Sequence, residues 1–193
     1  GDGLFYIWYM AGLFLLFKEV IRIIIKGEDK VMHERPGLES AMSAFIRYAE
    51  LSSVKYDAKL DIIKVEIALN DGIQDEQKKG FLTRYTQCIR LYNNIVGVEP
   101  IYNNLKVIDN SDITILRLYR DSTTLTEEEI ELFVGLVRQE FASFLIRDDN
   151  IMAAAVLSGD EKSNLLSKIR KSNDSYRNIF AYRDKGKVFV CNK

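Results

Sequence analysis

The chain has 193 residues, of which 47% are hydrophobic and 28% are charged, so it can form a packed core, and global disorder is excluded. Its 27 basic and 28 acidic side chains give a net charge of -1, so any contact with RNA requires a local basic patch. Two prolines and 11 glycines are too few for a sandwich of strands joined by tight turns, and this scarcity favours helices.

The first predicted element is an apolar helix near the N-terminus. Residues Leu4 to Phe17 contain no charge, and the apolar pattern continues to Ile25 past three charged residues. A membrane span needs roughly 20 residues, which the longer segment provides. We therefore expect a membrane anchor, within an oligomeric pore, whose lipid contacts come from Phe5, Trp8, Leu13, Phe14, Leu16 and Phe17.

Two other interpretations of this segment stay open. A signal peptide is disfavoured because no basic residue precedes the apolar run, whereas a helix buried in the core or docked on a partner is a serious alternative. Because Lys18 and Arg22 follow the run, the expected location is the cell inner membrane, with the bulk of the chain cytoplasmic. The expected organisation is an apolar helix over 1–27, a linker over 28–37 and a helical domain over 38–193.

The next segments predict a mostly α domain. A helix is expected from Leu38 to Leu51, with Pro36 at the first turn. Residues 57–69 show two conflicting signals, since apolar residues alternate as in a strand while alanine, lysine, glutamate and leucine favour a helix. We predict a helix there.

Further helices follow along the chain. Asp75 begins a helix that ends near Asn94, and residues 113–119 form a short ambiguous segment. Thr126 and Glu129 have the spacing of a capping box and predict a helix to about Ile146. Helices are also expected over 150–157, 161–171 and 175–182, and the last residues predict a short strand or extended tail.

Common catalytic and metal sites have little support in the sequence. Cys88 and Cys191 are far apart, and His33 is the single histidine, so neither a zinc site nor a Ser-His-Asp triad is indicated. No glycine-rich phosphate-binding loop occurs, and we expect no metal and no small-molecule cofactor.

The stretch SYRNIFAYRDKG, residues 175–186, resembles the RNA-cutting motif of the HEPN superfamily, in which a helix carries an arginine, a polar residue and a histidine. Arg177 and Asn178 match the first two positions, whereas Tyr182 replaces the histidine. The resemblance implies a HEPN-like helical bundle in which Arg177 holds phosphate. Because a phenol with a pKa near 10 is a poor base at neutral pH, catalysis by Tyr182 is disfavoured.

Basic residues are dense around this stretch. Lys171, Arg177, Arg183 and Lys185 are the candidate RNA-binding or anion-binding residues. The competing interpretation is structural, with the aromatic residues packing an amphipathic last helix and the basic side chains in water.

These features give three hypotheses about function. A membrane helix joined to a degenerate HEPN motif resembles the membrane accessory proteins of type VI-B CRISPR systems, which implies an oligomeric antiviral effector that permeabilises membranes without catalysis. Its expected partners are further copies of itself, lipid, and RNA or an RNA-guided effector. The second hypothesis is a HEPN-type endoribonuclease or RNA-binding protein using Arg177 and Asn178. The third is a non-catalytic interaction module.

Overall fold

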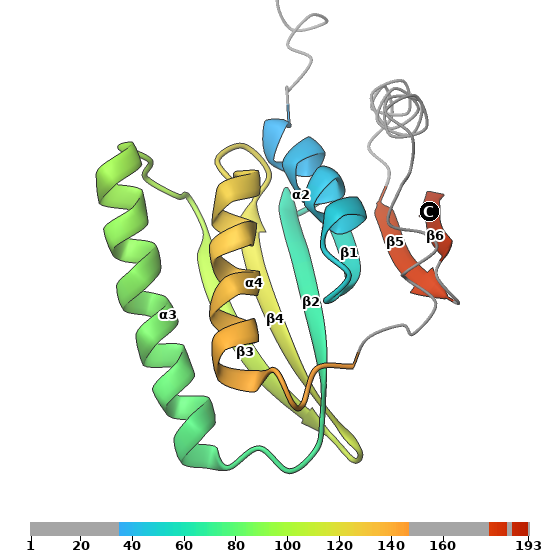
Figure 1. The fold of residues 1–193 in the computed structure, drawn as a ribbon. Helices are drawn as coiled ribbons and strands as arrows, with labels where there is room; N and C mark the ends of the chain where they lie inside the picture. Colours follow the sequence, from blue (N-terminus) through green and yellow to red (C-terminus); the bar gives the residue numbers. More distant parts are fainter. Residues whose placement is uncertain (1–34, 147–177, 185–186, 193) are drawn as a thin grey trace, which may run out of the picture. The chain divides into compact units, whose positions relative to one another are not determined.

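A six-stranded antiparallel sheet and three helices make up the part of the chain that the computed structural model describes, residues 35–146, 178–184 and 187–192 (Figure 1). The chain divides into two compact units, 1–34 and 35–193, and every described residue belongs to the second. The strand order is β3-β4-β2-β1-β5-β6.

The elements follow one another as a helix, two strand–strand–helix units and a final hairpin. The helices are α2 (Pro36–Arg47), α3 (Asp75–Val96) and α4 (Glu127–Phe141). The strands are β1 (Leu51–Asp57), β2 (Ile62–Asn70), β3 (Asn103–Asn110), β4 (Ile113–Asp121), β5 (Ile179–Asp184) and β6 (Lys187–Asn192). The units β1-β2-α3 and β3-β4-α4 meet where β2 pairs with β4 at the middle of the sheet.

This architecture shows that the predicted mostly α, HEPN-like bundle is wrong. Residues 57–69, predicted as a helix, form a turn and most of β2, while the ambiguous segment 113–119 lies in β4. Ile63, Val65 and Ile67 alternate along β2 and are fully buried. Pairing on both sides with β1 and β4 satisfies the backbone of β2, and this long-range pairing overrides the helical propensity of its residues.

Other predicted elements are confirmed. Pro36 begins α2, and α3 begins at Asp75 as expected, but α2 ends at Arg47, and Leu51 instead begins β1. Thr126 caps α4, since its hydroxyl accepts the backbone N–H of Glu129 at 3.1 Å. The C-terminal strand is present as β6. The helices predicted over 150–157 and 161–171 lie outside the described residues.

Aspartate and serine replace glycine and proline in the β1–β2 and β3–β4 turns. Between β1 and β2, the carboxylate of Asp57 accepts the backbone N–H groups of Lys59 and Leu60, and Asp61 has a left-handed φ of 54°. Between β3 and β4, Ser111 has a φ of 41°. The scarcity of glycine and proline therefore does not limit the strand content of this chain.

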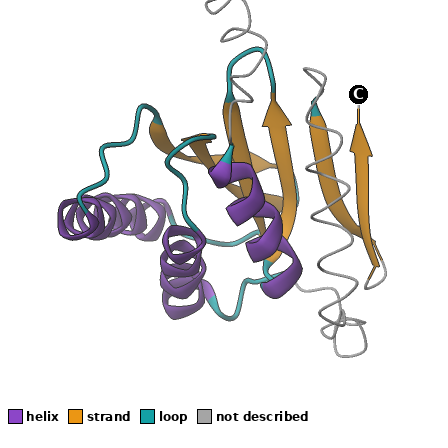
Figure 2. Cartoon of the chain, turned by 90° about the horizontal axis from the view of Figure 1, so that it is seen from above, coloured by secondary structure: helices purple, strands orange, loops and turns teal. Residues whose placement is uncertain are grey.

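The three helices cover one face of the sheet, and the hydrophobic core lies between the helices and that face (Figure 2). Phe45 of α2, Phe81 of α3 and Phe133 of α4 are among the buried core residues, together with alternate residues of the strands. In the described part of the chain, the other face of the sheet has no helix packed on it (Figure 2). We call this second surface the open face.

The expected inner-membrane location is also corrected. No helix within residues 35–146, 178–184 and 187–192 is both long enough and apolar enough to cross a membrane. The segment 1–27, with the predicted lipid contacts Phe5, Trp8, Leu13, Phe14, Leu16 and Phe17, lies outside the described residues.

Candidate nucleic-acid interface on the open face

One row of paired residues crosses all six strands on the open face. Residues that pair directly in an antiparallel sheet point to the same side, so the register determines which side chains are neighbours. The row runs from β6 to β3 through Phe189, Tyr182, Ser53, Glu66, Arg117 and Lys106. The next row contains Cys191, Phe180, Lys55, Lys64, Tyr119 and Asn104. Aromatic side chains thus lie at one end of the open face and basic side chains beside them.

The aromatic end is a stack of three rings. The ring centroids of Phe180 and Tyr182 are 5.3 Å apart with an interplanar angle of 21°, and those of Tyr182 and Phe189 are 5.2 Å apart with an angle of 16°. The ammonium of Lys55 lies over the ring of Phe180, 5.1 Å from its centroid, in a cation–π contact. Phe189 is 39% exposed, so the stack reaches the surface.

The basic side chains are held by a carboxylate, that of Glu66. It accepts hydrogen bonds from Ser53 Oγ, from Lys55 Nζ at 3.1 Å and from Arg117 Nε at 2.6 Å. Beside this cluster, Lys106 Nζ lies 5.4 Å from the ring centroid of Tyr119. Glu66 thereby fixes two cations in the middle of the open face next to the aromatic stack.

The pKa of Glu66 reflects these partners. Burial alone would raise the pKa of this carboxyl, but the hydrogen bonds from Ser53 and Lys55 and the charges of Lys55 and Arg117 outweigh burial and lower it. Glu66 is therefore a carboxylate at neutral pH and accepts the hydrogen bonds of Lys55 and Arg117 as a charged group.

The structure separates the residues that the sequence grouped as one motif. Residues 179–184 form β5, so the helix predicted over 175–182 is wrong in its described part. Asn178 binds the β1–β2 turn, where its Oδ1 accepts the backbone N–H of Ala58 at 3.0 Å. Tyr182 lies on the open face.

Arg183 points to the side of β5 opposite Tyr182. Its guanidinium donates hydrogen bonds to the backbone carbonyl oxygens of Phe45 and, at 3.2 Å, of Tyr48, at the C-terminal end of α2. A cation there complements the carbonyl end of a helix. Arg177, Lys171 and Lys185 lie outside the described residues, so the catalytic and anion-binding roles of the motif residues stay predictions.

Sequence reasoning missed most of the open face. The sequence predicts Phe180 in a helix and Phe189 in a short strand or extended tail, and it does not single out Lys55, Glu66 or Arg117. Their signal is the alternation of polar or aromatic residues with buried apolar ones, which has meaning only if the segments are read as strands. Within the described ranges, no cluster of three histidine, cysteine, aspartate or glutamate side chains is placed to hold a metal ion.

Comparisons with protein-family models, curated proteins and solved structures give no match for this chain. The HEPN relationship therefore stays a prediction made from the dozen residues that carry it.

Proposed function

We propose that the open face binds single-stranded nucleic acid, with RNA as the partner that the sequence predicted. The observation that carries the proposal is the stack of Phe180, Tyr182 and Phe189 beside the cations of Lys55 and Arg117. Aromatic side chains on the exposed face of an antiparallel sheet are a recurrent way of binding unpaired bases.

Each part of the open face has a physical task in this proposal. Unpaired bases stack on exposed aromatic rings, and such stacking contributes about 1–3 kcal/mol per base with little sequence preference. Lys55, Lys106 and Arg117 contact the phosphates, and their affinity falls as salt rises. Tyr182 is the middle ring of the stack and holds the two outer rings in place, and its phenol is not required to act as an acid or base.

A fluorescence-anisotropy titration of labelled single-stranded oligouridine against the full chain tests the proposal. Phe189→Ala removes one exposed ring, and we expect affinity to fall roughly tenfold, because one stacking contact is lost. The matched control is Tyr102→Ala, because Tyr102 is also 39% exposed but lies outside the two rows of the open face. This control is expected to bind like the wild type.

The same titration with a duplex of equal length separates stacking from charge. Rings stack only on unpaired bases, so the duplex is expected to bind much more weakly. Equal affinity for the duplex would show the proposal to be wrong. So would unchanged RNA affinity of Phe189→Ala, provided that the unfolding temperature of this variant equals that of the wild type. Gel analysis of the RNA afterwards tests the endoribonuclease hypothesis separately.

A further inference from the structure

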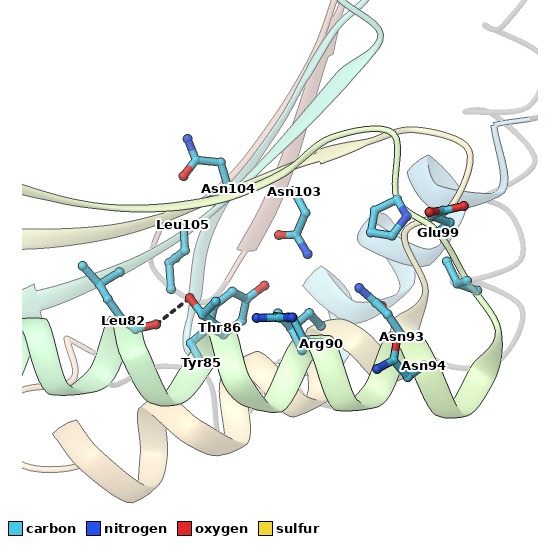
Figure 3. Close-up of a pocket in the computed structure, with 13 residues that line it drawn as sticks. Leu82, Tyr85, Thr86, Arg90, Asn93, Asn94, Glu99, Asn103, Asn104 and Leu105 are labelled. Carbon is cyan, nitrogen blue, oxygen red and sulfur yellow. Dashed lines mark hydrogen bonds between the residues drawn. The ribbon is translucent and has the colours of Figure 1, made fainter.

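A pocket of about 500 Å³ lies between α3 and the beginning of β3, closed at one end by the loop that joins them (Figure 3). Tyr85, Thr86 and Arg90 of α3 face Asn103 and Leu105 of β3 across it, whereas the side chain of Asn104 points away from α3 (Figure 3). Its volume lies within the range of small-molecule sites.

Two buried polar atoms in the pocket lining have no partner in the part of the chain that the structure describes. They are the hydroxyl oxygen of Tyr85 and the side-chain oxygen of Asn93. Tyr85 is only 2% exposed, and its ring is fixed edge-on against Phe133 at a centroid distance of 5.7 Å. A buried polar group without a partner destabilises the fold, so a ligand that bonds to both atoms would remove a cost already present.

The charges of the pocket lining have opposite signs. Arg90 is the only basic residue of the lining and Glu99 the only acidic one, and no described carboxylate forms an ion pair with Arg90. The last turn of α3, next to Glu99, contains no basic residue, so its carbonyl end adds negative potential. A phosphate or other dianion would meet a single cation and this negative end, which disfavours it.

A ligand with one charge of each sign fits this arrangement. We propose that the pocket binds a zwitterion with an apolar side chain, either a free α-amino acid or a short peptide. Arg90 and the hydroxyl of Tyr85 donate to its carboxylate, and its ammonium donates to Asn93 Oδ1 and faces Glu99. Ile89, Val98 and Leu105 of the lining contact its apolar side chain.

Amide chemical shifts of the full chain, followed by NMR during titration to millimolar ligand, test this proposal. The probes are L-leucine, leucyl-leucine and N-acetyl-L-leucinamide, which keeps the side chain but has neither charge. We expect saturable shifts in α3 and β3 with L-leucine or leucyl-leucine and none with N-acetyl-L-leucinamide. Stronger binding of L-leucine would identify the source as the free amino acid, and stronger binding of leucyl-leucine a short peptide.

Three variants assign the contacts. Tyr85→Phe removes only the unpartnered hydroxyl, so we expect unchanged or higher thermal stability and roughly tenfold weaker binding. Arg90→Gln is expected to weaken binding at least as much, whereas Lys79→Gln, a charge change on α3 outside the pocket, leaves it unchanged. No response to any probe, equal response to N-acetyl-L-leucinamide, or undiminished binding by both Tyr85→Phe and Arg90→Gln would overturn the proposal.

Discussion

Strand β4 carries two arginines that face opposite sides of the sheet, and each is bound by a glutamate. On the open face, Arg117 Nε donates to Glu66 of β2 at 2.6 Å, and the arginine side chain is 26% exposed. On the helix side, Arg120 Nε donates to Glu129 of α4 at 2.6 Å, and both side chains are completely buried. The same kind of ion pair, an arginine with a glutamate, therefore exists in two environments.

The two carboxyl groups have opposite net pKa shifts, although burial acts to raise the pKa of both. Burial raises the pKa of Glu129 more than its bonds and attraction to Arg120 lower it. The less deeply buried Glu66 has a lowered pKa, because its partners outweigh burial. Removing a charge from water costs more where burial is complete, so desolvation outweighs the partners of Glu129 but not those of Glu66.

The further contacts of the two arginines also differ. Arg120 Nη1 donates to Asp121 Oδ2 at 2.5 Å and to the carbonyl oxygen of Tyr102 at 2.9 Å, and its Nη2 donates to Thr124 at 3.1 Å. It thereby ties β4 to α4 and to the α3–β3 loop. Arg117 stays partly exposed, so the buried pair fixes the fold, whereas the open pair leaves a cation at the surface.

The largest expected effect comes from Arg120→Met. This variant leaves Glu129 buried without its cation, so the free energy of unfolding should fall by about 3–5 kcal/mol. Urea unfolding of the variant and the wild type measures it. Arg120→Met combined with Glu129→Leu should recover most of the loss, and a loss below about 1 kcal/mol would mean that the buried pair does not fix the fold.

Glu66→Gln should have a smaller, pH-dependent effect of about 1–2 kcal/mol, because charge-assisted hydrogen bonds to Ser53, Lys55 and Arg117 are weakened. Since the pKa of Glu66 is lowered in the fold, its stabilisation is fully present above its ordinary value of 4.5 and is lost as pH falls through the folded pKa. Urea unfolding between pH 7 and acid should show the wild-type advantage shrinking below about pH 4.5. An advantage that grows toward acid would contradict this sign.

The smallest expected change in stability comes from Arg117→Met. Because this ion pair is partly exposed, the free energy of unfolding should fall by about 1 kcal/mol or less. RNA binding should weaken severalfold, with the slope of log affinity against log salt reduced by about one. Anisotropy titrations at several salt concentrations measure both. An unchanged slope would show that Arg117 does not contact phosphate.

Local signals were sufficient for part of the fold. The capping by Thr126 at the start of α4, Pro36 at the start of α2 and the beginning of α3 at Asp75 follow from residues within one turn of each helix. The strands were not predictable in this way, because Ile63 to Leu69 reads equally well as either element until β1 and β4 are known to pair with it.

The candidate sites were less predictable than the fold. Three separate strand pairings make neighbours of Phe189, Tyr182, Ser53 and Glu66. The spacing of these residues in the sequence does not indicate that they are neighbours. Tyr85 and Asn93 were part of a correctly predicted helix, yet their unpartnered atoms are evident only once β3 lies opposite α3.

The sequence by itself determined the Thr126 cap and the starts of α2, α3 and α4, and it showed that a net charge of -1 allows only a local basic patch. These properties depend on neighbouring residues or on composition. The tertiary structure alone decided that segments of mixed propensity are strands, and that Arg117 faces the surface while Arg120, three residues later, is buried. Strand pairing decided both, because it satisfies backbone hydrogen bonds over long sequence distances and assigns each side chain to one face of the sheet.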